Sequence, residues 1–510
     1  MRTSPPQDLP GRAGARGRPP TAARFVRAHR ALGALGTLSL LGVLSLLVAT
    51  VLTPSGAQAA PVTVLNGTQF TDVNGDPLHA HGGGVIEVDG YYYWFGENRQ
   101  EDSNGFRYVS AYRSTDLRNW EFRNHVLTQE SDPELAQANI ERPKVMYNEA
   151  TGQFVMWAHK ENGQDYSEAR AAVAVSDTVD GDYTWQGSFR PLDHMSRDIT
   201  VFVDDDGTGY MVSAARENYD LHIYRLTDDY TDVAELVANP WPGGHREAPA
   251  LFKRDGVYFM LTSGATGWDP NQQRYATSTD LAGGWSEMRN VGDATAFGSQ
   301  TAFVLPVQGD QRTSYLYLGD RWGNSFGGRV NDSRYVWLPL SFPDSRTLAM
   351  EWAPELVIDT DTGTVAAAGG PYQTLTARHS GKCLDIPDHA LAVGQQAGQW
   401  TCNGGNNQRF WAREVGDGQV QLVSRATSLC LGVADGSTAA GAAVVQELCA
   451  PDRASQRWRL TDAGEDHVSL VAGHSGQCLD VADESTADGA RLIQYGCADV
   501  GWQQFRLAAA

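Results

Sequence analysis

The six cysteines of the chain form three pairs with one internal spacing, all in its last third. The members of each pair are 19 residues apart and the pairs recur at steps of 47 and 48: Cys383 with Cys402, Cys430 with Cys449, and Cys478 with Cys497. A Cys-Leu dipeptide opens each unit, and a Gln-x-aromatic triplet closes it (Gln408 to Phe410, Gln456 to Trp458, Gln503 to Phe505). The last third is therefore an internal repeat of three units.

The first 59 residues have the composition of a signal peptide. Seven arginines and one acid precede an apolar run over residues 31–52, and Ala57-Gln58-Ala59 is a small-residue cleavage site before Ala60. A run of this length could also span a membrane, so an uncleaved anchor is the alternative. The cleavage site and the long chain after it favour a secreted, extracellular protein without stable membrane association after cleavage.

Composition excludes several classes of function. The net charge of −21 makes nucleic acid an improbable partner, because phosphate binding requires a basic surface. In an exported protein the six cysteines would form three disulfides and leave no free thiol, which argues against thiol catalysis and a cysteine zinc site. The length of 510 residues predicts two or more domains.

Residues 60–365 predict an all-β domain of short aromatic strands. A Gly- or Asp-containing turn followed by such a strand recurs five times, at Asp89-Gly90, Thr151-Gly152, Asp206-Gly207, Asp255-Gly256 and Gly309-Asp310. Strands that end in Ser and Asp before a tryptophan, as at Ser114 to Trp120, suit outer strands. The spacing favours a five-bladed β-propeller over the alternative, a β-sandwich. We predict a linker at residues 366–371 and a second domain at residues 372–510.

Both predicted domains resemble known families. The cysteine repeat resembles the ricin-type β-trefoil lectin, called carbohydrate-binding module family 13 when attached to an enzyme. The stretches upstream of the hairpins resemble glycoside hydrolase family 43, and most of all its exo-β-1,3-galactanase subgroup. The motifs that carry this second resemblance are His79 to Gly84, Glu141 to Val145, Ser196 to Asp198 with Phe202 to Gly207, and Arg246 to Pro249.

The resemblance assigns the catalytic residues of an inverting glycosidase. Glu247 would be the general acid, and Asp198 would raise the pKa of that acid and orient it. The usual first-blade aspartate is missing, because this chain has Gly82 to Ile86 there. In the subgroup a fifth-blade glutamine, here Gln300, is proposed to hold the water in its imidic acid form. Glu141 is the rival base, since a carboxylate accepts a proton more easily.

Further contacts follow from the same resemblance or from position. We expect substrate binding by Glu97, Tyr166, Asp220, Thr266, Trp268 and His81. His79 and His81 on one short stretch lack the further ligands that a metal needs, so neither a metal nor a cofactor is predicted.

The trefoil units differ in their predicted sugar sites, which need an acid, an aromatic platform and an amide. The first and third units supply these groups through Asp385, Trp400, Asn407, Gln408, Asp480, Tyr495 and Gln503. The second unit has Gly432 in place of the acid and Glu447 in place of the aromatic residue, which predicts a structural unit without a working site.

The predicted protein is a monomeric secreted exo-acting galactanase that releases galactose from β-1,3-galactan, the backbone of arabinogalactan, and binds galactose through a lectin module. The alternatives are an α-L-arabinofuranosidase or β-xylosidase of the same family, which the missing aspartate disfavours, and a catalytically inactive lectin.

Overall fold

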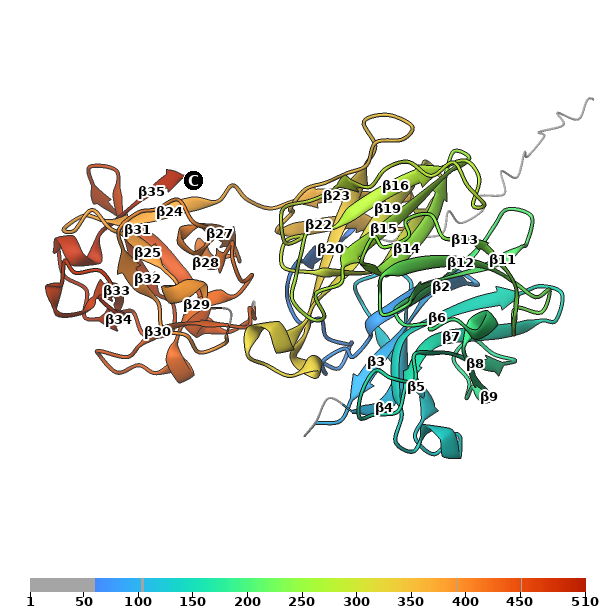
Figure 1. The fold of residues 1–510 in the computed structure, drawn as a ribbon. Helices are drawn as coiled ribbons and strands as arrows, with labels where there is room; N and C mark the ends of the chain where they lie inside the picture. Colours follow the sequence, from blue (N-terminus) through green and yellow to red (C-terminus); the bar gives the residue numbers. More distant parts are fainter. Residues whose placement is uncertain (1–59, 102–104, 391, 451) are drawn as a thin grey trace, which may run out of the picture. The chain divides into compact units, whose positions relative to one another are not determined.

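The computed structural model describes residues 60–101, 105–390, 392–450 and 452–510 (Figure 1), so the predicted signal peptide lies outside the described residues. Five four-stranded antiparallel sheets follow one another along the chain. The first three are β2 (His81–Val88), β3 (Tyr91–Arg99), β4 (Phe106–Ser114), β5 (Glu121–Thr128); β6 (Asn139–Asn148), β7 (Gln153–Glu161), β8 (Arg170–Ser176), β9 (Thr184–Phe189); and β10 (Ile199–Val203), β11 (Gly209–Ala215), β12 (Asp220–Leu226), β13 (Val233–Ala238).

The last two of these sheets have the same order. They are β14 (Arg246–Arg254), β15 (Val257–Gly264), β16 (Arg274–Ser278), β17 (Arg289–Asn290); and β18 (Gln300–Gln308), β19 (Thr313–Arg321), β20 (Arg334–Ser341), β21 (Ala349–Met350). Each aromatic hairpin predicted from the sequence joins the first and second strands of one sheet. The first strands contact one another in a closed ring, in the order β2, β6, β10, β14, β18 and back to β2. This is the arrangement of a β-propeller.

Separate apolar clusters fill the gaps between neighbouring sheets, which explains why the strands are rich in large apolar residues. On β7, Met156 belongs to the cluster shared with the first sheet, whereas Trp157 belongs to the cluster shared with the third. On β11, Met211 and Val212 are divided between two clusters in the same way. Because successive side chains of a strand point to opposite faces, each of these sheets is buried on both sides.

The segments before the first sheet and after the last sheet of the propeller pair with each other and close the ring. A three-stranded sheet joins β1 (Val62–Leu65) to β22 (Glu355–Asp359) and β23 (Thr364–Ala368). The buried Asn66 side chain donates to the carbonyl oxygens of Trp337 and Ala353, at 2.6 and 2.9 Å. The segment before the first sheet is thereby bound to the last one.

The predicted linker at residues 366–371 begins inside a strand. Ala366, Ala367 and Ala368 of β23 pair with Val357, Leu356 and Glu355 of β22. An alanine run has no strong preference of its own, and here strand pairing decides its conformation. Only residues 369–372 separate β23 from the next strand, so the linker is shorter than the composition indicated.

Residues 373–509 form a twelve-stranded sheet built from the cysteine repeats. Its strands are β24 (Gln373–Ala377), β25 (Cys383–Asp385), β26 (Gly398–Trp400), β27 (Phe410–Glu414), β28 (Gln419–Ser424), β29 (Cys430–Val433), β30 (Val444–Glu447), β31 (Trp458–Gly464), β32 (His467–Ala472), β33 (Cys478–Val481), β34 (Leu492–Tyr495) and β35 (Phe505–Ala509). The three predicted disulfides are formed, and they leave no free cysteine in the described residues.

Equivalent residues of the three units meet in one core. The leucine after the first cysteine of each pair and the aromatic residue that closes each unit all belong to a single buried cluster, which contains Leu384, Leu431, Leu479, Phe410, Trp458 and Phe505. The repeat signature is therefore the trefoil core. The all-β prediction is confirmed, since the part of the chain that the structure describes contains strands and short 3-10 helices but no α-helix.

Candidate active site

A cavity of about 390 Å³ is lined by residues from all five propeller sheets. Four of the five first strands carry a bulge near the cavity, where one extra residue interrupts the pairing with the second strand. The backbone at Gly82, Arg142 and Ala248 has positive φ angles of 62°, 53° and 50°. Such bulges re-aim the neighbouring side chains, and left-handed non-glycine residues are typical of functional sites.

Glu247 lies beside the bulge of β14 and is 5% exposed. Its Oε1 accepts a hydrogen bond from Gln300 Nε2 at 3.1 Å, and its Oε2 accepts one from Asn218 Nδ2 at 2.9 Å. Burial, followed by the negative charge of Asp198, raises the pKa of Glu247 to about 8. At neutral pH this carboxyl group therefore carries a proton that it can donate.

Asp198 is held next to Glu247 by two contacts. Its Oδ2 accepts a hydrogen bond from the backbone N–H of Ala248 at 3.0 Å, and its Oδ1 lies 3.0 Å from Nε of Arg142. Because Ala248 directly follows Glu247, the bulge that aims the acid also fixes the neighbouring carboxylate.

Arg142 is buried and joins three sheets of the propeller. Besides the ion pair with Asp198, its guanidinium donates to the carbonyl oxygen of Thr301 at 2.9 Å and to Oε1 of Gln300. Its backbone N–H donates to Oε1 of Glu97 at 2.8 Å. One residue of the second sheet therefore positions groups of the first, third and fifth sheets.

The orientation of the Gln300 amide follows from its neighbours. Its Oε1 accepts hydrogen bonds from Arg142 and, at 2.8 Å, from the indole N–H of Trp322. Neither partner can accept a hydrogen bond. The nitrogen of Gln300 must therefore face Glu247 and Ser263, to which it donates at 3.1 and 3.0 Å.

Glu141 lies in a second group of charges across the cavity. Its Oε1 accepts from Arg99 at 3.0 Å and from the Tyr166 hydroxyl at 2.9 Å, and its Oε2 lies 3.2 Å from Nδ1 of His159. Burial raises the pKa of Glu141, but His159 and Arg99 outweigh burial and hold that pKa well below its usual range. Arg99 also pairs with Glu97, whose pKa burial raises.

Comparisons with known sequences and structures identify the families to which the two domains are similar. Residues 81–302 match the glycosyl hydrolases family 43, and residues 371–508 match the ricin-type beta-trefoil lectin domain. The chain is 46% identical to an exo-beta-1,3-galactanase from Clostridium thermocellum, over 88% of this chain and 100% of that one, with a TM-score of 0.61. The chain belongs to glycosyl hydrolases family 43. It is a glycoside hydrolase with a ricin-type lectin module.

Other solved structures of the family are more distant. An exo-beta-1,3-galactanase from Phanerochaete chrysosporium, solved with beta-1,3-galactotriose, is 26% identical over 88% of this chain and 92% of that one, with a TM-score of 0.61. A family 43 beta 1,3 galactosidase solved with galactodeoxynojirimycin is 34% identical over 57% of this chain and 99% of that one, with a TM-score of 0.53. No curated protein matches the chain.

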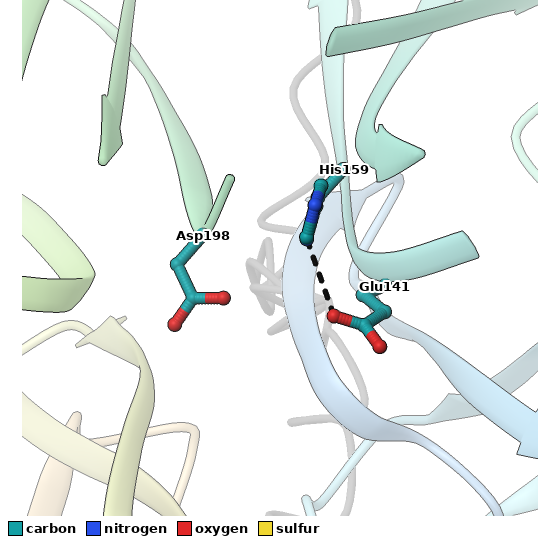
Figure 2. A group of neighbouring side chains, drawn as sticks. All are labelled: Glu141, His159 and Asp198. Atoms are coloured by element: carbon teal, nitrogen blue, oxygen red, sulfur yellow. Dashed lines mark ion pairs between the residues drawn. The ribbon is translucent and has the colours of Figure 1, made fainter. Parts of the chain in front are cut away.

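Figure 2 shows that Glu141, His159 and Asp198 of this family 43 domain face one another. One potential ligand atom from each lies within 4.8 Å of the others, which is close enough to hold a metal ion. Burial lowers the pKa of His159, but its contacts with Glu141 and Glu161 outweigh burial and raise it to about 9. His159 contacts Glu141 at 3.2 Å and Glu161 at 2.8 Å, so ion pairing by itself accounts for this group.

The cavity brings together three of the six residues predicted to bind substrate. Glu97, Tyr166 and Trp268 line it, together with the four predicted catalytic residues. The other three predicted contacts lie elsewhere. His81 is fully buried and pairs with Asp320 at 3.1 Å, and the hydroxyl of Thr266 donates to the carbonyl oxygen of Asp269.

Asp220 is also absent from the cavity lining, for a reason that its neighbours explain. Its carboxylate accepts from Arg216 at 2.7 and 2.8 Å and from the backbone N–H of Gly243 at 2.8 Å. It anchors the turn between β11 and β12, and that turn places Asn218 and Tyr219 at the cavity instead.

Sequence reasoning gave no role to several residues that line the cavity or contact its carboxylates. They are Arg99, Arg142, His159, Asn218 and Trp322. Arg142 directly follows Glu141 in the motif Glu141 to Val145, so its place beside a candidate catalytic residue could have indicated a role in the site. Trp322 lies 22 residues beyond Gln300, and no local pattern connects them.

In each trefoil unit the glutamine that closes the unit donates a hydrogen bond to a carboxylate. Gln408 donates to Oδ2 of Asp385 at 2.8 Å, and Gln503 donates to Oδ2 of Asp480 at 2.7 Å. Asn407 also donates to Asp385, at 2.9 Å. The predicted platforms Trp400 and Tyr495 are 44% and 51% exposed, as a stacking surface for a sugar requires.

The second trefoil unit supplies its carboxylate from the opposite strand. Gln456 donates to Oε2 of Glu447 on β30 at 3.0 Å, in place of an acid on β29. A Cβ atom on Gly432 of β29 would lie 2.7 Å from this Oε2. Glycine at this position therefore makes room for the glutamate, and no exposed aromatic residue stands at the position of Trp400 and Tyr495.

Proposed function

We propose that this chain removes galactose from the non-reducing end of β-1,3-galactan with inversion at the anomeric carbon. The observation that supports this most is a protonated Glu247 fixed beside Asp198 in a cavity of a family 43 domain. The galactanase substrate is supported by the identity of 46%, which extends over both domains of the solved galactanase.

Glu247 acts as the general acid in this proposal. Its proton moves to the oxygen that links the terminal galactose to the next sugar, as the bond from that oxygen to the anomeric carbon breaks. A carboxylic acid with a pKa near the working pH suits this step, because the acid is protonated and still transfers its proton readily.

Either Gln300 or Glu141 positions or deprotonates the attacking water. As an amide, Gln300 can only donate to a water, and that hydrogen bond would replace one of those to Glu247 and Ser263. Its imidic acid form would place an O–H opposite Arg142 and Trp322, which accept no hydrogen bond. Glu141 is an ionised carboxylate, but its lowered pKa makes it a weak base. The direct contact between Gln300 and Glu247 fits a role for Gln300 in orienting the acid, because an inverting enzyme needs room for the sugar and the water between its acid and its base.

The lectin module and the export signal complete the proposal. Galactose binding by the first and third trefoil units would keep the catalytic domain on its polymer, which raises the local concentration of chain ends. Three disulfides fit an oxidising, extracellular location. The described residues contain no helix that is long and apolar enough to cross a membrane.

The test is galactose release from β-1,3-galactan by the wild type and by Glu247→Gln. We expect a loss of about 10³-fold in kcat for the variant, and in the wild type a decline of kcat/KM above pH 8, where Glu247 loses its proton. NMR should show the α-anomer of galactose first. Release of arabinose or xylose instead would overturn the substrate assignment, and no release from any glycoside would favour a lectin without catalysis.

A further inference from the structure

The turn between β11 and β12 has an unusual backbone. Arg216, Glu217 and Asn218 have φ angles of 49°, 56° and 62°, so three consecutive residues other than glycine are left-handed. Such a conformation is unfavourable for a residue with a Cβ atom and persists only where its surroundings hold it. The surroundings of this turn therefore hold its backbone, and with it the directions of its side chains.

Contacts on both sides hold the turn. Asp220 binds Arg216 and the backbone of Gly243, and Glu217 forms an ion pair with Arg197. The backbone N–H of Tyr219 donates to the carbonyl oxygen of Arg216 at 3.1 Å. These contacts leave the Asn218 side chain directed at the cavity.

The Asn218 amide meets the carboxyl group of Glu247 with one end and leaves the other end unused. Its Nδ2 donates to Oε2 of Glu247 at 2.9 Å. Its Oδ1 is buried and makes no hydrogen bond among the residues that the structure describes. A half-turn about the bond between Cβ and Cγ exchanges the two ends, after which Oδ1 can accept a hydrogen bond from a proton on the same carboxyl oxygen.

The two oxygens of Glu247 are therefore not equivalent. Oε1 faces Gln300 Nε2, which can only donate because Arg142 and Trp322 occupy the amide oxygen. Oε2 faces Asn218, which can accept or donate. A hydrogen-bond acceptor for the acid proton is thus available at Oε2.

We propose that Asn218 is the positioning residue that places the acid proton on Oε2 of Glu247. Before the reaction the proton is bonded to Oε2, and Oδ1 of Asn218 accepts a hydrogen bond from it. As the proton moves to the leaving sugar oxygen, the electron pair of the broken O–H bond remains on Oε2. The amide then turns back, and Nδ2 of Asn218 donates to the new carboxylate, as in this structure. Hydrogen bonds to charged groups are the stronger ones, so this bond favours the transition state over the ground state.

The inference rests on the proposed function, and its test separates the two. The test compares β-1,3-galactobiose, whose leaving sugar needs a proton, with 2,4-dinitrophenyl β-galactoside, whose leaving group does not. For Asn218→Ala we expect kcat/KM to fall by about 10- to 100-fold on the disaccharide and to stay within about threefold on the aryl galactoside. Glu247→Ala should show the same selectivity with a larger loss.

Two further variants test the role of the amide itself. Arg225→Ala changes a partly exposed residue of β12 that pairs with Glu235 outside the turn, and it should keep the wild-type ratio of the two rates. Asn218→Asp places a second carboxylate beside Glu247, in addition to Asp198. This negative charge should raise the pKa of Glu247 against the opposing charges of Arg142 and Arg246. The alkaline limb of the pH profile on galactobiose should therefore move to higher pH.

Equal losses on both substrates in Asn218→Ala, or an unmoved alkaline limb in Asn218→Asp, would overturn the inference. A wild type that releases no galactose from galactobiose would instead overturn the proposed function.

Discussion

The propeller and the trefoil both consist of repeated units, but they use the repetition in opposite ways. Four of the five propeller sheets have a bulge in the first strand and place different side chains there, such as Glu141 and Glu247, which meet in one cavity. Each trefoil unit instead keeps its acid and its glutamine together, as Asp385 and Gln408 do. Distributed residues make one asymmetric site, whereas local sets make several similar sites.

This difference predicts how the two regions respond to substitution. In the propeller a single side chain supports groups of several sheets, so its loss should disable the whole site. In the trefoil the loss of one acid should affect one unit and leave the others working. The predictions below proceed from the largest expected effect to the smallest.

Arg142→Met should have the largest effect. The change removes the partner of Asp198 and Gln300 and leaves the partly buried carboxylate of Asp198 uncompensated, which costs about 1 to 3 kcal/mol of stability. We also expect at least a 10³-fold loss of kcat on galactobiose. Calorimetry and initial rates measure the two effects. Arg142→Lys keeps the charge but not the forked geometry, and full activity in that variant would contradict the bridging role.

Glu141→Gln and Gln300→Glu should separate the two candidates for the water. If Glu141 accepts the proton, Glu141→Gln should lower kcat by about 10²- to 10⁴-fold and Gln300→Glu should not restore it. If Gln300 serves the water, Gln300→Glu should retain activity with a new acidic limb in the pH profile. Rates of both variants on galactobiose from pH 4 to 9 decide between them. Equal small losses would exclude both assignments.

Asp385→Ala and Asp480→Ala should have the smallest effects. Each should weaken binding to insoluble β-1,3-galactan by a few fold, and the double variant should weaken it by about 10²-fold through loss of multivalency. Cosedimentation with the polymer measures this binding. Hydrolysis of galactobiose should stay at the wild-type rate in all three variants. A loss of polymer binding as large in one single variant as in the double variant would show that only one unit binds.

The sequence predicted those features that depend on neighbouring residues. The trefoil core could be recognised because Leu384 and Phe410 recur at fixed spacing in each unit. The hairpins at Asp89-Gly90 and Asp255-Gly256 could be recognised because a turn and its flanking strands are contiguous. Motif resemblance then placed Glu247 and Asp198, which the structure brings together.

The remaining features depend on residues that are distant in the chain. Arg142 and Gln300 are 158 positions apart, and only closure of the ring brings them into contact. The resemblance predicts that Asp220 contacts the substrate, and in the structure its carboxylate pairs with Arg216, four positions earlier. The polar residue of that turn that reaches the cavity is Asn218, and no pattern distinguishes it from an ordinary turn residue.

The exchange of Gly432 and Glu447 in the second trefoil unit restricts how this sequence can diversify. Either strand can carry the carboxylate, and a side chain at position 432 would come within 2.7 Å of Oε2 of Glu447, so that carboxylate would have to move. The two positions are therefore coupled, and no single substitution converts this unit into a copy of its siblings. An evolutionary path back to three alike units has to change both positions.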